Sequence, residues 1–214
     1  MSVYISTISV DIPICKCYPA DMSDKPDSKE KTVLAAARLL RRHGYHGTAL
    51  SDILAAAGSP RGSLYFHFPE GKEQIAVAAL TLAAEGVRQA IAGAAKASGS
   101  ADEFLIRIAR GMAADLVRSD FREGCPIAPT ALEMSGASEA LTAAAVAAFR
   151  GWEQEIATAL HSFGFKSEGA RLLATASLSQ LEGALLLART YRDAEPMRRA
   201  EASIRMLVRA FAGT

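Results

Sequence analysis

Aromatic residues are scarce in this 214-residue sequence: they make up 7% of the chain and include one tryptophan. Hydrophobic residues make up 50%, and alanine and leucine are the most frequent of them. Strands favour β-branched and aromatic side chains, whereas alanine and leucine favour helices. The composition therefore argues against a β-sheet protein and predicts an all-α fold that is large enough to bury a sizeable core.

Cysteine is also rare, since Cys15, Cys17 and Cys125 are the three in the sequence. An odd number does not fit a disulfide framework, and Cys15 and Cys17 are too close for an easy disulfide, so we expect a reducing, cytoplasmic environment. Cys15 and Cys17 could form half of a zinc site, but the sequence has no second Cys/His pair at finger-like spacing. We therefore expect no metal site and no cofactor.

Long apolar runs are missing as well. The sequence has no run of about 18 uninterrupted apolar residues, and its first residues lack the basic start and apolar stretch of a secretory signal. We expect a soluble protein that stays in the cytoplasm and has no membrane partner, with Met22 as an alternative to Met1 as the first residue.

Enzymatic motifs are not evident. The four histidines form no metal-ligand pair at i, i+4 with a partner, and neither serine nor cysteine stands in a nucleophile elbow. Cys125 is then expected to be an ordinary loop or core residue rather than a nucleophile. The sequence therefore does not predict an enzyme.

The net charge of +1 conceals one basic segment, residues 28–72. Its seven basic residues are Lys29, Lys31, Arg38, Arg41, Arg42, Arg61 and Lys72, and its three acidic residues are Glu30, Asp52 and Glu70. The segment thus carries a charge of +4, and the rest of the chain sums to −3. A local excess of positive charge of this kind is typical of a nucleic-acid-binding surface.

Glycines, prolines and capping residues divide the chain into three parts. Residues 1–27 contain three prolines and no sustained helical period, and we predict a disordered tail whose excess of acidic residues disfavours a DNA-contacting arm. Residues 28–72, called the head below, are predicted to form helices over 31–43, 49–57, capped by Thr48, and 61–68. Residues 73–214, called the body, follow. A helix over 72–97 is predicted to lead from the head into the body, and the further predicted helices span 101–119, 127–134, 137–163, 167–191 and 196–212.

Two short helices joined by a tight turn that contains glycine describe a helix-turn-helix. Its recognition helix reads base edges with residues near its amino end, here Arg61, Gly62 and Ser63, because arginine can donate two bonds to guanine and glycine permits close approach. Thr48, Tyr65, His67 and Lys72 are expected to bind phosphates, and Phe66 to contact a thymine methyl group. Leu64 and Phe68 are expected to pack the core of the head.

The segment from Gly44 to Gly58, followed by residues 62–68 and by Lys72-Glu73, resembles the DNA-binding head of the TetR family. The resemblance implies that the residues matching Thr48, Tyr65 and Lys72 touch phosphates and that those matching Arg61 and Ser63 read bases. Gly71 looks like an added residue relative to the commonest pattern. Together with residues 124–127 and 131–133, it resembles the LmrA/YxaF-like branch, which implies aromatic drugs or plant-type phenolics as effectors.

The body is expected to hold an effector pocket and a dimer interface. Large or flexible side chains gather in its middle helices, and the candidate ligand contacts are Phe104, Met112, Phe149 and Trp152, although an ordinary core would use the same residue types. The family resemblance implies a homodimer through the last two long helices. Their apolar stripes, which could instead close the core of the single chain, are Leu173, Leu178, Leu181, Leu185, Ile204, Leu207, Val208 and Phe211.

Taken together, these features predict a ligand-responsive transcriptional regulator, a repressor that a small aromatic or apolar effector releases from a palindromic double-stranded DNA operator. The alternative is a helical protein-interaction module that no longer binds DNA. Salt dependence separates the two, because phosphate-driven binding weakens steeply as salt is added.

Overall fold

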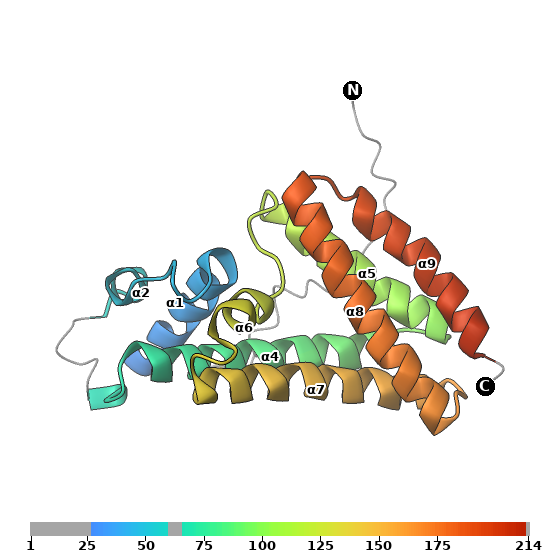
Figure 1. The fold of residues 1–214 in the computed structure, drawn as a ribbon, viewed down its shortest axis with the longest axis horizontal. Coiled ribbons are helices and arrows are strands. Elements are labelled where there is room, and N and C mark those ends of the chain that lie inside the picture. Colours follow the sequence, from blue (N-terminus) through green and yellow to red (C-terminus); the bar gives the residue numbers. More distant parts are fainter. Residues whose placement is uncertain (1–26, 60–65, 213–214) are drawn as a thin grey trace.

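The computed structural model describes residues 27–59 and 66–212, and the secondary structure within these ranges is helical, with no strand (Figure 1). The helices are α1 (Ser28–His43), α2 (Leu50–Ala57), α4 (Lys72–Lys96), α5 (Ala101–Arg118), α6 (Ala128–Met134), α7 (Glu139–Ser162), α8 (Ser167–Tyr191) and α9 (Glu195–Phe211). The expected all-α fold is confirmed. The predicted tail, residues 1–27, lies outside the described residues except for Asp27.

The starts of α1 and α2 differ from the sequence-based expectation for reasons that the structure shows. Helix α1 begins at Ser28 rather than at Lys31, because the Asp27 side chain caps it by accepting a hydrogen bond from Glu30 N at 2.8 Å. The prediction that Thr48 caps the second helix is wrong. The N-cap of α2 is Ala49, which makes no side-chain cap bond, and the Thr48 hydroxyl instead donates to the Gly44 carbonyl at 2.7 Å.

A small core holds the described part of the head together. Leu40 of α1, Ile53 of α2 and Phe68 are each at most 2% exposed, and they belong to one continuous hydrophobic cluster with Ile75 of α4. Phe68 therefore packs the core as predicted. The spacing of apolar residues along these short helices buries one stripe of each, and packing rather than intrinsic propensity stabilises helices of this length.

Helix α4 joins the head to the body. It packs against α1 in the head and against α7 along the body (Figure 1). Helix α8 packs against α7, α9 and α5. By length and composition alone, with a mean hydropathy of 1.4, α4 could cross a membrane. Its apolarity has an explanation within the fold, because Ile75, Ala79, Leu80 and Ile91 are buried against the neighbouring helices.

Candidate nucleic-acid interface and effector cavity

Lys72 is the predicted phosphate contact that the structure places most clearly. It is the first residue of α4, and its Nζ donates to the Tyr45 carbonyl at 2.7 Å and lies 4.0 Å from the centre of the Tyr45 ring. Partial burial lowers the pKa of Lys72, and the nearby Glu133 carboxylate opposes this shift. An ammonium carries three donors, so this anchored position leaves donors for a phosphate oxygen.

Thr48 is less suited to the expected phosphate contact. Its side chain is 1% exposed, its hydroxyl donates to the Gly44 carbonyl, and its backbone N–H donates to the Tyr45 carbonyl at 3.3 Å. Both donors are therefore engaged within the head, where Thr48 fixes the turn between α1 and α2. A phosphate contact through Thr48 would first require one of these bonds to break.

Of the predicted recognition helix, residues 61–68, the structure describes residues 66–68. Phe66 and His67 are helical, and their rings meet edge to face with centroids 5.2 Å apart. Phe66 is 84% exposed, which leaves its ring available for the apolar base contact predicted from sequence. Arg61, Gly62, Ser63 and Tyr65, the remaining predicted DNA contacts, lie outside the described residues, as does Leu64.

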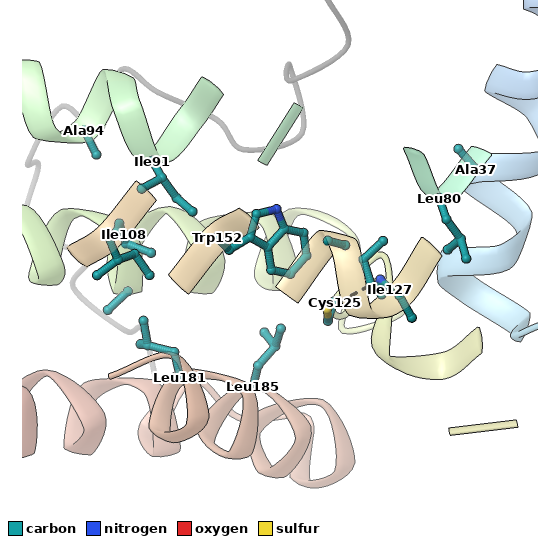
Figure 2. Close-up of a cluster of buried hydrophobic side chains, with 14 of the residues drawn as sticks. Ala37, Leu80, Ile91, Ala94, Ile108, Cys125, Ile127, Trp152, Leu181 and Leu185 are labelled. Atoms are coloured by element: carbon teal, nitrogen blue, oxygen red, sulfur yellow. Dashed lines mark hydrogen bonds between the residues drawn. The ribbon is translucent and has the colours of Figure 1, made fainter. Parts of the chain in front are cut away.

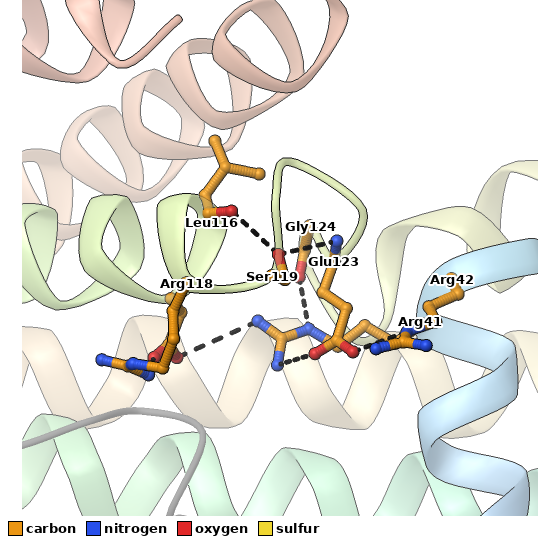
Figure 3. Close-up of polar contacts among 8 residues, drawn as sticks. Arg41, Arg42, Leu116, Arg118, Ser119, Glu123 and Gly124 are labelled. Atoms are coloured by element: carbon orange, nitrogen blue, oxygen red, sulfur yellow. Dashed lines mark hydrogen bonds and ion pairs between the residues drawn. The ribbon is translucent and has the colours of Figure 1, made fainter. Parts of the chain in front are cut away.

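Two of the seven basic residues counted in the head face the body instead. Arg41 donates from Nε to the Gly124 carbonyl at 2.7 Å, and its Nη1 lies 3.5 Å from the Glu123 carboxylate (Figure 3). Arg42 donates to the same carboxylate at 2.7 Å, and its own carbonyl accepts from Arg189 of α8 at 2.9 Å. The positive charge of Arg41 and Arg42 is thus balanced by the body, which the charge count from sequence could not show.

A second contact between head and body involves α6. The Glu133 carboxylate accepts a hydrogen bond from His46 N at 2.7 Å and lies directly over Gly44. Gly44 has a φ of +72°, and a Cβ there would stand 2.0 Å from Glu133 Oε1, so both conformation and space require glycine. We call the Arg41, Arg42, Glu123, Gly124 and Glu133 contacts the head–body junction.

Gly44→Ala tests this junction. A side chain at Gly44 strains the left-handed backbone and pushes Glu133 away from His46 N. We expect a loss of roughly 1–3 kcal/mol of unfolding free energy. Urea denaturation measures it, and Gly99→Ala in the body, where a Cβ meets its nearest neighbour at 3.8 Å, is the matched control. Equal stability of both variants would contradict the tight packing inferred for Gly44.

An apolar cavity lies inside the body, between α4, α5, α7 and α8. Its volume is about 60 Å³, and its walls include Ile91, Ile108, Met112, Ile156 and Leu181. The Trp152 indole also lines it, at the centre of the buried side chains in Figure 2, and its Nε1 donates to the Ala84 carbonyl at 2.9 Å. Met112 and Trp152, two predicted ligand contacts, therefore meet at one cavity.

A larger, open groove adjoins this inner cavity. It has a volume of about 610 Å³, lies between α6 and α8, and shares Gly124, Cys125, Glu182 and Leu185 with the cavity. Phe149, the third predicted ligand contact, lines the groove and meets Trp152 edge to face at 5.4 Å. Small-molecule sites occupy several hundred Å³, so the groove and cavity together have the size that the cavity alone lacks.

Phe104, the fourth predicted ligand contact, lies elsewhere. It is fully buried in α5 and packs against Phe163 with ring centroids 5.9 Å apart. It lines neither the inner cavity nor the groove. In this structure Phe104 is a core residue, which is the alternative that its residue type left open.

Three acidic groups, Asp115, Cys125 and Glu182, line the inner cavity near the loop after α5. Burial raises the pKa of Asp115, although Arg118 and Arg41 oppose the shift. Burial also raises the pKa of Glu182 and of the Cys125 thiol, which lie within hydrogen-bonding reach of each other. A thiol with a raised pKa is a poor nucleophile, in agreement with the expectation for Cys125. Among residues 27–59 and 66–212, no cluster of His, Cys, Asp or Glu could hold a metal ion.

The apolar stripes of the last two helices serve mainly the core of the single chain. Leu173, Leu181, Leu185, Ile204 and Val208 are at most 8% exposed, and Leu178, Leu207 and Phe211 are half-buried. Other apolar residues of α8 and α9 remain exposed, namely Leu172, Leu186, Leu187, Tyr191 and Met206. Leu187 and Tyr191 line a surface groove of about 670 Å³ between α8 and α9.

A head built of short helices that ends in Lys72, on a helical body with an apolar cavity, is the arrangement expected of a helix-turn-helix regulator. Comparisons with known proteins identify the family. Residues 33–79 match the model of bacterial regulatory proteins of the tetR family, and residues 101–203 match the C-terminal domain of LmrA/YxaF-like transcriptional regulators. The chain belongs to the TetR family of transcriptional regulators.

Relatives match over most of their length. The chain is 33% identical to the uncharacterized regulator YxaF of Bacillus subtilis, covering 88% of this chain and 98% of that protein. It is 34% identical to the regulator LmrA of the same species, over 80% of this chain and 91% of LmrA. A crystal structure of a TetR regulator from Chloroflexus aurantiacus, 32% identical, superposes with a TM-score of 0.72 over 85% of this chain and 93% of the other. These relatives are regulators, not enzymes, in agreement with the sequence-based expectation.

Proposed function

We propose that this TetR-family regulator is a ligand-responsive repressor, a cytoplasmic homodimer that a small aromatic or apolar effector releases from a palindromic operator. The observation that supports the proposal best is that one loop, residues 119–127, both lines the effector cavity and binds the head. Gly124 belongs to the cavity wall and accepts the hydrogen bond from Arg41 of α1. An occupant of the cavity therefore acts on the loop that holds the DNA-binding head.

The DNA contact of this proposal uses the exposed end of the head. Arg61 and Ser63 read bases, Phe66 adds an apolar base contact, and Lys72 with Tyr65 and His67 binds phosphates. The half-buried position of Lys72 against Tyr45 supports this role, because a preordered ammonium loses less side-chain freedom on binding. Thr48 contributes by fixing the turn before α2.

The response to effector requires two states of the junction with different affinity for DNA. Asp120 and Phe121, at the start of the loop, have φ values of 53° and 58°, a left-handed conformation that costs about 1–2 kcal/mol per residue. A loop under such strain can adopt a second arrangement when a ligand displaces Gly124. Release of Arg41 and Arg42 then lets α1 and α4 swing the two heads away from the spacing of the major grooves.

The effector response can be measured with the protein's own fluorescence. Trp152 is the one tryptophan of the chain and lines the cavity, so bound aromatic compounds change its emission. We expect compounds that do so to weaken DNA binding by about 5- to 150-fold, the usual range of allosteric coupling. Compounds that saturate Trp152 and leave DNA affinity unchanged would contradict the effector mechanism.

The proposed dimer uses the exposed face of α8 and α9. Because Leu187 and Tyr191 are 45% and 63% exposed beside the α8–α9 groove, we expect Leu187→Glu to convert a dimer into a monomer and lower operator affinity more than ten-fold. Val146→Glu on α7, where the side chain is 42% exposed, is the control for an exposed apolar residue away from this face. Sedimentation measures the oligomeric state of both variants, and anisotropy measures their operator affinity. A Leu187→Glu variant that stays a dimer and keeps its operator affinity would contradict this interface.

A further inference from the structure

One charged group beside the head–body junction is incompletely satisfied. Asp115, in the last turn of α5, is 3% exposed, and its Oδ1 accepts a hydrogen bond from Arg118. Its Oδ2 is buried and accepts no hydrogen bond from the residues that the structure describes. Burial raises the pKa of Asp115 even though Arg118 and Arg41 oppose the shift, so its charge is only partly balanced. A buried carboxylate oxygen in this state favours any donor that can reach it.

The Arg41 guanidinium lies next to this oxygen. Its Nη2 is 4.0 Å from Asp115 Oδ2. Its Nη1 is 3.5 Å from the Glu123 carboxylate (Figure 3), and its Nε donates to the Gly124 carbonyl at 2.7 Å. Both distances to the carboxylates exceed the length of a charge-assisted hydrogen bond, which is about 2.7–2.9 Å. Arg41 therefore stands between two carboxylates and is not in close contact with either.

The two carboxylates belong to different parts of the body. Asp115 is part of helix α5, whereas Glu123 and Gly124 belong to the loop of residues 119–127. Arg41 is in the last turn of α1, so the position of its guanidinium decides whether the head is tied to the loop or to the helix. Arg42, the next residue of α1, donates to Glu123 at 2.7 Å and keeps that carboxylate paired when Arg41 leaves it.

Two positions of Arg41 satisfy similar numbers of polar groups. In the position that the structure describes, the Gly124 carbonyl is bonded and Asp115 Oδ2 is not. A shift of the guanidinium by about 1 Å toward Asp115 brings Nη2 to hydrogen-bond length, and the bond to Gly124 lengthens in exchange. Because one bond replaces another, the two arrangements are close in free energy, which is the property that a switching element needs.

We propose that Asp115 is a second docking position for the Arg41 guanidinium, and that exchange of Arg41 between the loop and Asp115 sets how the body holds the DNA-binding head. Asp115 is a positioning residue that acts through Arg41. The proposal rests on the proposed function, because it names the two states of the junction that the effector response requires. The loop-bound position is the state with the higher DNA affinity.

The exchange can be tested without DNA by urea denaturation of the full chain. Arg41→Gln and Asp115→Asn form a double-mutant cycle, which measures how strongly the two side chains depend on each other. In a Glu123→Gln background Arg41 loses the competing charge, and its bond to Asp115 should form. We expect the coupling in that background to exceed the coupling in the unchanged chain by about ten-fold in the unfolding constant, as for a hydrogen bond to a charged group. Equal coupling in both backgrounds would overturn the proposal.

Operator affinity tests the same exchange with Arg41 left in place, so it also decides the question should Arg41→Gln fail to fold. By anisotropy, Glu123→Gln should weaken binding to the duplex from upstream of the chain's own gene by at least about five-fold, and adding Asp115→Asn should restore most of that loss. A contact that merely joins head and body would instead give additive losses. Glu103→Gln, which removes the same charge from the exposed start of α5, is the matched control for the second change and should restore nothing.

The two measurements keep this proposal distinct from the proposed function. If neither the unchanged chain nor the variants bind DNA at low salt, the repressor function is wrong, while a coupling that grows in the Glu123→Gln background still supports the exchange. If DNA binds but Asp115→Asn restores no more affinity than Glu103→Gln, the role of Asp115 is overturned and the repressor function stands.

Discussion

Replacement of Lys72 by alanine is expected to weaken binding to every DNA sequence by at least about ten-fold, because a charge-assisted bond to phosphate is lost in each head. The change also removes the bond from Nζ to the Tyr45 carbonyl, which orients α4 against the end of α1. The slope of log affinity against log salt should fall by about one for each lost phosphate contact. Anisotropy titrations at several salt concentrations measure both quantities.

Lys96→Ala is the matched control for this experiment. Lys96 is the last residue of the same helix, 25 residues long, so at 1.5 Å per residue it lies about 36 Å from Lys72. The two variants lose the same charge from opposite ends of α4. If both lowered DNA affinity equally, net charge rather than a phosphate contact at Lys72 would explain the loss, and the proposed interface would be wrong.

The second large effect concerns stability. Phe104→Ala should lower the free energy of unfolding by about 3–5 kcal/mol, because it removes a fully buried ring that packs against Phe163. Phe66→Ala, at a ring that is 84% exposed, should change stability by less than about 0.5 kcal/mol. Urea denaturation compares them. A small loss for Phe104→Ala, together with altered affinity for the aromatic compounds that change Trp152 emission, would place Phe104 at the ligand site.

Most helix boundaries could be predicted from sequence because local chemistry sets them. The glycines at 44, 58 and 164, all with positive φ in the structure, end helices where the sequence placed the ends. The exceptions are equally physical. Asp27 caps α1 from within the predicted tail. The Thr48 hydroxyl donates to the Gly44 carbonyl instead of capping α2.

The candidate site was predictable only in part, because sequence reports residue type but not partner. Aromatic and flexible residues were expected near the effector, yet nothing local distinguishes Trp152, which lines the cavity, from Phe104, which fills the core. Arg41 and Asp115 are 74 positions apart, and their proximity depends on how the loop after α5 folds back to the head. The segments around Gly124 and Glu133 could be singled out from sequence because they resemble the LmrA/YxaF-like branch. In the structure both segments contact the head.

The central claim is that the head binds DNA with sequence preference. It is tested most directly by fluorescence anisotropy of the purified chain with a duplex from upstream of its own gene, beside an unrelated duplex, across a salt series. The account predicts tight binding to the first duplex, much weaker binding to the second, and affinity for both that falls steeply with added salt. No binding to either duplex at low salt would contradict the account and favour a helical protein-interaction module.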